Sequence, residues 1–167
     1  MPNTVFGLPT HALVVHGTVV LVPLAALLLT VAALWPRLRY SLGPLPALGG
    51  AVGLILVPIT TMSGDNLKDR LGFESPAITK HADLGDGLLP WVAALFAAAL
   101  LLLWADGWRP TAWATPRPSA SGTRARPRAL TLVVSLIVVA LAVITVVQII
   151  RIGHSGAEAV WQGVGSS

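Results

Sequence analysis

Residues 12–35 read ALVVHGTVVLVPLAALLLTVAALW, a run of mostly apolar residues without a single Asp, Glu, Lys or Arg. In a helix, about 20 apolar residues at 1.5 Å each span the hydrocarbon core of a bilayer, which is about 30 Å thick. Three further segments meet this requirement, at about residues 42–62, 88–105 and 129–150. The sequence therefore predicts an all-α protein, an integral membrane four-helix transmembrane bundle that forms a single domain over residues 1–167.

The composition agrees with a membrane protein and restricts its chemistry. Hydrophobic residues make up 54% of the chain and charged residues 11%, with a mean hydropathy of +0.77, whereas about a quarter of the residues of a soluble domain are charged. The chain has no cysteine, which excludes disulfides, thiolate zinc sites, iron–sulfur clusters and covalent c-type haem. No enzyme activity is expected, because the sequence contains no nucleotide-binding glycine loop, zinc-protease motif or nucleophile elbow.

Basic residues in the loops predict the orientation, because short loops rich in Lys and Arg stay in the cytoplasm. Arg37 and Arg39 occupy the first loop, and residues 106–128 hold five arginines among Pro, Ser and Thr, which predicts a flexible basic cytoplasmic loop. Residues 64–87 are acidic, so both termini are expected to be extracytoplasmic. The preference for Arg over Lys favours a bacterial cytoplasmic (inner) membrane. The net charge of +4 comes from the arginine loop, so the expected partner is the lipid bilayer and not a nucleic acid.

Small residues and prolines predict how the helices pack. Gly49 and Gly53 form a small-xxx-small face that favours a tight helix crossing. Pro23, Pro58 and Pro90 lie inside or at the edge of a span and are expected to loosen a helical turn. No internal repeat is expected, since the first span carries two histidines and the second none.

All four histidines are predicted to lie on the outer side of the membrane. His11 and His16 stand at the start of the first span, His81 precedes the third, and His154 follows the fourth. Polar residues at membrane depth are rare and usually functional. These histidines are therefore the main candidates for a binding site.

The sequence around His81 indicates the start of a helix. Ser75 is a good N-cap and Pro76 suits the first helical position, so a helix from about residue 76 should lead into the third span. Gly85 would then lie one turn after His81, where it leaves room for a flat group.

Two imidazoles with cations nearby are what a non-covalent haem b requires. His16 and His81 are predicted as its axial pair, with His11 and His154 as further ligands of the iron or of a second site. Arg151 shares a helix face with His154 and supplies a cation. The residues expected around the haem are Thr60, Thr61, Ser63, Lys80, Gly85 and Arg151. Such a protein would carry electrons to or from a redox partner protein, although three Phe and one Tyr are few aromatics for a haem pocket.

Two alternatives remain open. In the first, the imidazoles join Asp65, Asp83 or Asp86 in a zinc or copper site, since these ligand types suit borderline ions. In the second, the chain is a non-catalytic structural subunit that packs against a membrane complex through its glycine face. A homo-oligomer is also open.

Three stretches of the sequence are similar to a known family: GLPTHALVVH at residues 7–16, VPITTMSGD at 57–65 and HADLGDGLLPW at 81–91. They resemble the signature segments of the bacterial four-helix membrane family catalogued as domain of unknown function 2231 (DUF2231). The resemblance covers all four helices. Some relatives look fused to Rieske-type or cytochrome modules, which implies an electron-transfer or haem-binding role outside the membrane. Two departures are Ala12, where the family often has proline, and His154, which matches no family motif.

Overall fold

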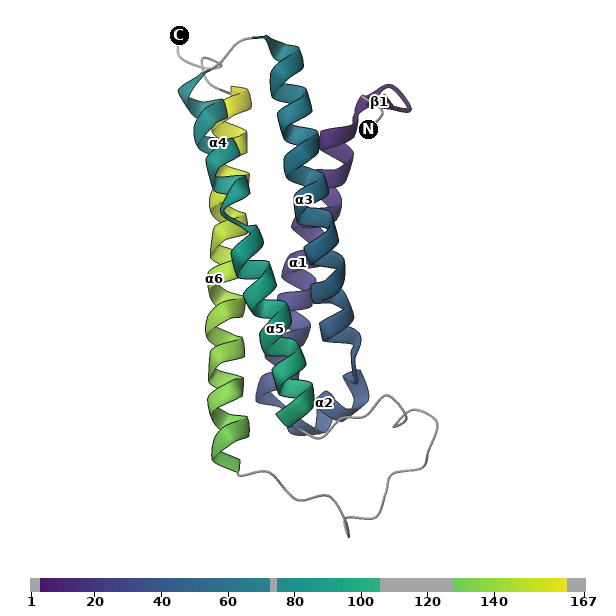
Figure 1. The fold of residues 1–167 in the computed structure, drawn as a ribbon, viewed down its shortest axis with the longest axis vertical. Helices are drawn as coiled ribbons and strands as arrows, with labels where there is room; N and C mark the ends of the chain where they lie inside the picture. The colour runs from purple at the N-terminus through teal and green to yellow at the C-terminus, as the bar shows by residue number, and fades with distance from the viewer. Residues whose placement is uncertain (1–3, 73–74, 106–127, 162–167) are drawn as a thin grey trace.

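In a computed structural model, the structure describes residues 4–72, 75–105 and 128–161. The described elements follow one another along the chain as a short hairpin and six helices (Figure 1). They are β1 (Thr4–Val5), β2 (Leu8–Pro9), α1 (Thr10–Leu34), α2 (Pro36–Leu42), α3 (Leu45–Leu71), α4 (Pro76–Asp86), α5 (Leu89–Ala105) and α6 (Arg128–Trp161). The loop predicted at residues 106–128 lies outside the described residues, apart from Arg128, which begins α6.

Four helical segments are long and apolar enough to cross a membrane, which confirms the predicted four-helix architecture. They are Thr10–Leu34, Leu45–Leu71, Pro76–Ala105 and Arg128–Trp161. The second and fourth are longer than the sequence suggested, because hydropathy marks the part of a helix that lies in lipid and not the point where the helix ends. Trp161, which lies beyond the fourth apolar segment of about residues 129–150, is the final residue of α6.

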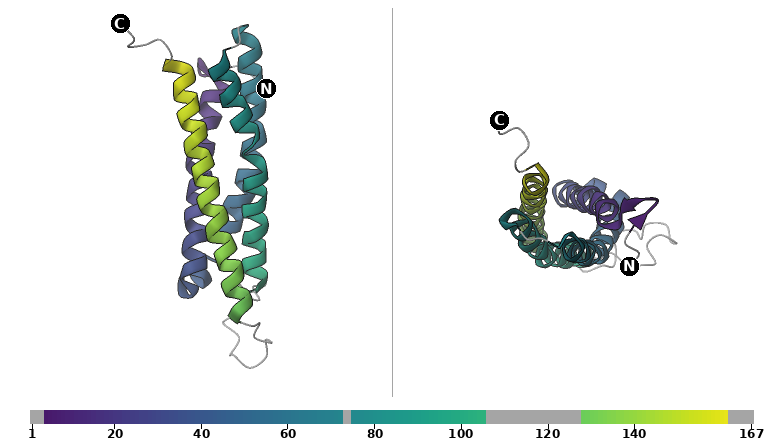
Figure 2. Two further views of the ribbon diagram at one scale, coloured as in Figure 1. Left: turned by 90° about the vertical axis from the view of Figure 1, so that its left-hand side faces the viewer. Right: turned by 90° about the horizontal axis from the view of Figure 1, so that it is seen from above.

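The long helices form a ring of four (Figure 2). Helix α1 packs against α3 and α6, and α5 packs against the same two helices from the opposite side. Helix α4 precedes α5 and lies along α6. We call the end of the bundle at which α1 and α4 begin and α3 and α6 finish the histidine end; it is uppermost in Figure 1.

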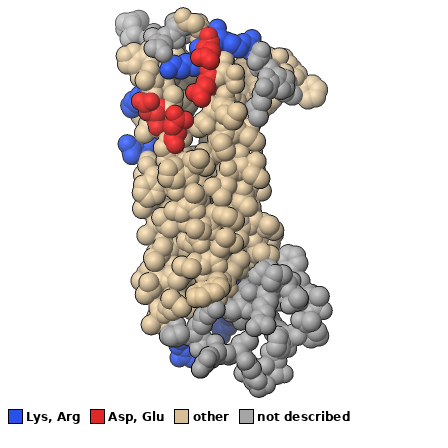
Figure 3. All heavy atoms as spheres, viewed as in Figure 1, with Lys and Arg blue, Asp and Glu red and all other residues tan. Residues whose placement is uncertain are grey.

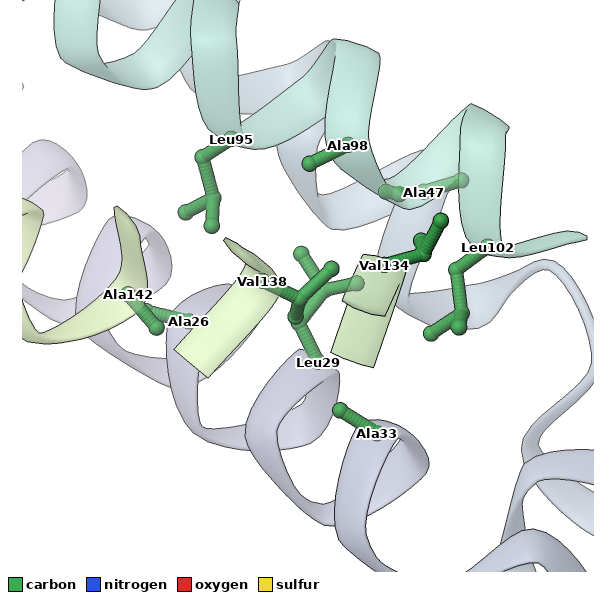
Figure 4. Packing of buried hydrophobic residues seen from close by; sticks show 11 residues of the cluster. Ala26, Leu29, Ala33, Ala47, Leu95, Ala98, Leu102, Val134, Val138 and Ala142 are labelled. Atoms are coloured by element: carbon green, nitrogen blue, oxygen red, sulfur yellow. The ribbon is translucent and has the colours of Figure 1, made fainter. Parts of the chain in front are cut away.

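The interior of the bundle is built from small and branched apolar side chains. The larger cluster of buried residues joins α1, α3, α5 and α6 around Leu29, Leu95 and Val138 (Figure 4). At Gly49 a Cβ atom would lie 2.8 Å from the Cβ of Ala25, and at Gly53 it would lie 3.1 Å from Val92. This confirms the predicted tight crossing, and it also shows that the glycine face contacts the chain's own helices. The structural-subunit hypothesis required this face to be free to bind a partner complex, and it is not free.

The outer surface suits a lipid environment. On the face drawn in Figure 3, acidic residues gather at the histidine end, basic residues lie at both ends, and the band between them is uncharged. Many large apolar side chains point outward from this part of the bundle, including Leu136, Leu132 and Ile55, which are 69%, 65% and 61% exposed. Such a surface is stable in hydrocarbon and costly in water.

At the end opposite the histidines, Arg39 has a role that the sequence did not predict. The sequence placed it in a solvated basic loop, whereas it is only 5% exposed. Its Nε donates to the carbonyl of Ala32 at 2.6 Å, and its Nη2 donates to the carbonyl of Ala33 at 2.8 Å. The last carbonyls of a helix have no partner within the helix. By folding back through α2, Arg39 satisfies two of these carbonyls at the end of α1, where a cation also favours the helix dipole.

Candidate ligand site at the histidine end

A cavity of about 490 Å³ opens between the helices at the histidine end. Its volume falls within the range of about 300–1,000 Å³ that is usual for small-molecule and cofactor sites. Much of its wall is apolar, with Val15, Val57, Ile78 and Ile149 among the lining residues. The lining includes residues of α1, α3, α4 and α6, so a group bound there would contact both helix pairs.

His11 reaches this cavity from the first turn of α1 and is fixed by α3. Its Nδ1 lies 3.2 Å from the carbonyl oxygen of Thr60 and 3.1 Å from the Oγ of Ser63. A Cβ atom on Gly64 would lie 3.1 Å from the Cε1 of His11, so only glycine lets the ring pack this closely. Since a carbonyl oxygen can only accept, Nδ1 donates the hydrogen bond. The neutral ring therefore keeps an unprotonated Nε2.

His81 is held in the same way, by α6. Its Nδ1 lies 3.1 Å from the carbonyl oxygen of Ile152 and 3.2 Å from the Oγ of Ser155. A Cβ atom on Gly156 would lie 3.0 Å from the Cε1 of His81. We call the set His11, Thr60, Ser63 and Gly64 the first clasp, and the set His81, Ile152, Ser155 and Gly156 the second clasp.

The helix that carries His81 begins as the sequence predicted. Ser75 is the N-cap of α4, and its side chain accepts a hydrogen bond from the backbone nitrogen of Ile78 at 3.2 Å. Pro76 occupies the first helical position. The helix then breaks at Gly87 before α5 begins at Leu89. This cap fixes where α4 begins, and so fixes the position along α6 at which His81 makes its contacts.

Both clasps prepare an imidazole to act as a ligand. A histidine that binds a metal usually donates its other ring N–H to a carbonyl, which fixes the tautomer and the orientation of the ring. Within the part of the chain that the structure describes, no hydrogen bond is made by the Nε2 of His11 or of His81. Both rings line the same cavity.

The other two histidines differ. His16 also lines the cavity, but its Nδ1 is bonded to the carbonyl of Ala12 in its own helix, and its side chain is not held by a second helix. His154 is not among the residues that line the cavity. Its side chain is 76% exposed, and its Nε2 lies 3.2 Å from an oxygen of Glu158. The structure thus brings His11, His16 and His81 to the cavity and leaves His154 outside.

The remaining candidates are divided between the cavity and the outer surface. Thr61, Gly85, Asp65 and Asp86 line the cavity, whereas Asp83 and Lys80 line a separate hollow beside α4. The Nζ of Lys80 is 2.9 Å from Glu158, and the exposed Arg151 donates to Gln148. Neither Lys80 nor Arg151 supplies the cation expected beside the ligand. Lys68 of α3, which the sequence did not single out, lines the cavity instead.

The sequence also missed Ile152, Ser155 and Gly156, which form the second clasp. The signal that could have found them is the Ser-Gly dipeptide, which stands at residues 63–64 and again at 155–156.

The donor set limits which metals fit. Over residues 4–72, 75–105 and 128–161, no three His, Cys, Asp or Glu side chains are grouped so that they could hold a metal ion. Zinc sites normally need three or four protein ligands. A haem iron needs only two, because the macrocycle supplies the other four. A zinc or copper site would need further ligands, whereas two imidazoles are the number of protein ligands that a haem iron takes.

Comparison with known proteins gives one match. The model of a family described as predicted membrane protein (DUF2231) matches residues 7–166. No curated protein and no solved structure matches the chain.

Proposed function

The chain belongs to the DUF2231 family of predicted membrane proteins, and we propose that it binds haem b between His11 and His81 and carries electrons. The observation that supports this proposal is the pair of clasps, each of which presents an imidazole with its Nδ1 bonded to a carbonyl at the same cavity. Haem iron, when bound, supplies one-electron transfer. The role of this chain is to hold the ring by two nitrogen atoms in a mostly apolar cavity.

The assignment of the axial pair follows from the clasps. The sequence favoured His16 with His81, but a second helix fixes the ring of His11 and not that of His16. A histidine ligand whose other ring nitrogen donates a hydrogen bond to a carbonyl is more basic and better oriented. Lys68 is the lysine among the residues that line the cavity.

The first experiment is the optical spectrum of the detergent-purified protein, oxidised and then reduced with dithionite, after expression with ample haem. We expect a Soret band that sharpens on reduction and split visible bands, both lost in His11→Ala and in His81→Ala. His154→Ala is the matched control and should keep the spectrum, because its side chain lies outside the cavity. His16→Ala should also keep the split bands. A featureless spectrum of the unaltered protein would refute haem binding.

Zinc or copper is the second candidate: Asp65 and Asp86 line the same cavity as His11 and His81, but among the described residues no three such side chains are grouped around one point, so metal binding would require them to move together. Metal analysis of the same sample separates this candidate from haem. If neither metal nor haem is found, a structural subunit remains as the alternative, but it would have to pack through a surface other than the glycine face.

We also propose that the histidine end faces the outside of a bacterial cytoplasmic membrane, with both termini there. The support is the excess of arginine in the first loop and in the loop predicted at residues 106–128, which join the spans on the side opposite the histidines. The chain has no native cysteine, so single cysteines at Trp161 and at Ser41 can report their side by labelling with a membrane-impermeant maleimide. Labelling of Trp161→Cys in intact cells, with Ser41→Cys protected, is expected. The reverse result would invert the topology.

A further inference from the structure

The two helix pairs share sequence at the residues that build the clasps. Residues 10–17 read THALVVHG and residues 80–87 read KHADLGDG, with His, Ala and Gly at the same places. The helix that follows in each pair carries Ser-Gly, at residues 63–64 and 155–156. This correspondence runs against the prediction that the chain has no internal repeat.

Burial follows the same register in both pairs. If the sequences are aligned so that His11 matches His81, buried residues of α1 align with buried residues of α5 and of the position just before it. The matched buried pairs are Thr18 with Leu88, Val22 with Val92, Ala25 with Leu95, Leu29 with Ala99 and Ala32 with Leu102. If Ser63 is matched with Ser155, the same holds for α3 and α6. Here the matched buried pairs are Pro46 with Val138, Gly50 with Ala142, Gly53 with Thr145 and Val57 with Ile149.

The local geometry also agrees between the clasps. The bond from Nδ1 to the carbonyl is 3.2 Å for His11 and 3.1 Å for His81, and the distance to the serine Oγ is 3.1 Å and 3.2 Å. Each serine hydroxyl donates to the same carbonyl that its histidine uses, at 2.8 Å for Ser63 and 2.9 Å for Ser155. The same three groups, an imidazole, a backbone carbonyl and a serine hydroxyl, are therefore arranged alike in two places that are far apart in the sequence.

The packing of the helices is what a two-fold axis along the bundle would produce. Exchange of α1 with α5 and of α3 with α6 turns the α1–α3 contact into the α5–α6 contact, and the α1–α6 contact into the α5–α3 contact. All four contacts are present, and the two helices of each exchanged pair face one another across the ring (Figure 2).

We infer that the chain is an internal duplication of one helix pair, and that His11 and His81 are equivalent ligands of a single group on the pseudo-two-fold axis. As regards the ligand, this inference rests on the proposed function. It adds that the bound group contacts one imidazole nitrogen from each half, and that the two contacts are equivalent. A metal centre between two imidazoles meets this condition, and so does an organic molecule with two like hydrogen-bond donors.

Ligand rescue tests the equivalence on the full-length, haem-loaded protein. His11→Gly and His81→Gly should each lose the six-coordinate low-spin spectrum, and free imidazole should restore it in both at similar concentrations. His16→Gly should need no rescue. Loss of the low-spin spectrum in only one of the first two variants would overturn the equivalence.

A second measurement needs no ligand and so separates failure of this inference from failure of haem binding. In protein labelled with ¹⁵N-histidine, the rings of His11 and His81 should both show the Nδ1-protonated tautomer. Ser63→Ala and Ser155→Ala should each alter the signal of only their own histidine. Each should also lower the unfolding temperature by about 2–4 °C, since each loses about one hydrogen bond.

Different tautomers at His11 and His81, or unlike responses to the two serine variants, would overturn the duplication. A protein without haem that still shows matched tautomers and matched responses would leave the duplication intact and refute only the proposed cofactor.

Discussion

The two helix pairs carry the same clasp on differently built first helices. In the first pair, α1 runs unbroken from Thr10 to Leu34, with His11 in its first turn. In the second pair, His81 lies on the short α4, and the chain breaks at Gly87 before α5 crosses the membrane. The clasp is nevertheless the same to within 0.1 Å in its hydrogen bonds. The two halves therefore share the geometry around the imidazole. They differ in the helix that carries the histidine.

The surroundings of the clasps differ in polarity. Below the first clasp, the hydroxyls of Thr18 and Thr60 meet at 2.7 Å. The matched positions in the second half are Leu88 and Ile152, which are apolar. The two halves also differ in charge, because His16 is matched by Asp86, and both line the cavity. A ligand on the axis would thus have two equivalent attachments but unequal neighbours.

The largest effect is expected at Arg39, which caps the end of α1 in the first pair and also donates to the Oγ of Ser135 in α6 at 3.4 Å. Arg39→Met removes the donors to the carbonyls of Ala32 and Ala33, and the loss of these buried charged hydrogen bonds should lower the free energy of unfolding by about 2–3 kcal/mol. The measurement is chemical unfolding in detergent micelles.

Arg37→Met is the control for Arg39, because Arg37 is exposed on the same short helix. The tautomers of His11 and His81 should be unchanged in Arg39→Met, since the clasps lie at the other end of the bundle. A changed tautomer would show that the two ends are coupled.

The next effect compares the clasps directly. In Gly64→Ala and Gly156→Ala the new Cβ would lie 3.1 Å and 3.0 Å from the histidine ring. Each ring must shift, which should cost about 1–3 kcal/mol, partly offset by the better helix propensity of Ala. Gly153→Ala is the matched control on α6, because nothing lies within 4 Å of its new Cβ, and it should leave the protein unchanged or more stable. If Gly64→Ala and Gly156→Ala lose unequal amounts of stability, the two clasps are not equivalent.

A smaller effect is expected from converting the first half to the chemistry of the second. Thr18→Leu and Thr60→Ile each remove one partner of the hydroxyl pair, although each remaining hydroxyl still donates to a carbonyl of its own helix. A double-mutant cycle should give a coupling energy of about 0.6 kcal/mol, the average for such pairs in membranes. The double variant should remain folded, as the apolar second half does. If the double variant is much less stable than the sum of the single variants implies, the two halves are not interchangeable at this level.

The smallest effect concerns the second half alone, where Lys80 pairs with Glu158. This ion pair is solvent-exposed, and such pairs contribute little because water and salt screen them. Lys80→Met should leave the unfolding midpoint unchanged within error at moderate salt. A clear loss would show that the second half needs this bond between α4 and α6 as well as its clasp.

Most of the fold could be predicted from the sequence, because the spans are long apolar runs and the start of α4 has a strong cap at Ser75 and Pro76. Four-helix architecture and family were both confirmed. The burial of Arg39 could not be predicted, since it depends on α2 folding back over the end of α1. The duplication was missed because the connection between α5 and α6, residues 106–127, is much longer than that between α1 and α3. The matched helices therefore do not recur at one fixed spacing.

The role of the site residues was harder to predict. That the cavity is lined by His11, His16 and His81 but not His154 depends on how each helix is rotated. Sequence periodicity places residues on a helix, but the contact of His11 with Thr60 and Ser63 depends on the packing of α1 against α3. Only that packing distinguishes His11 from His16.

Because each clasp joins helices of its own pair, the order of assembly during synthesis follows from the fold. The contacts of His11 with Thr60 and Ser63 need only the first two spans, so they can form in the membrane while the ribosome is still translating the rest. The second clasp needs Ser155 of α6, which is synthesised after the first two spans. The first clasp can therefore form before the second, and the cavity between them is closed only once α6 has joined the bundle.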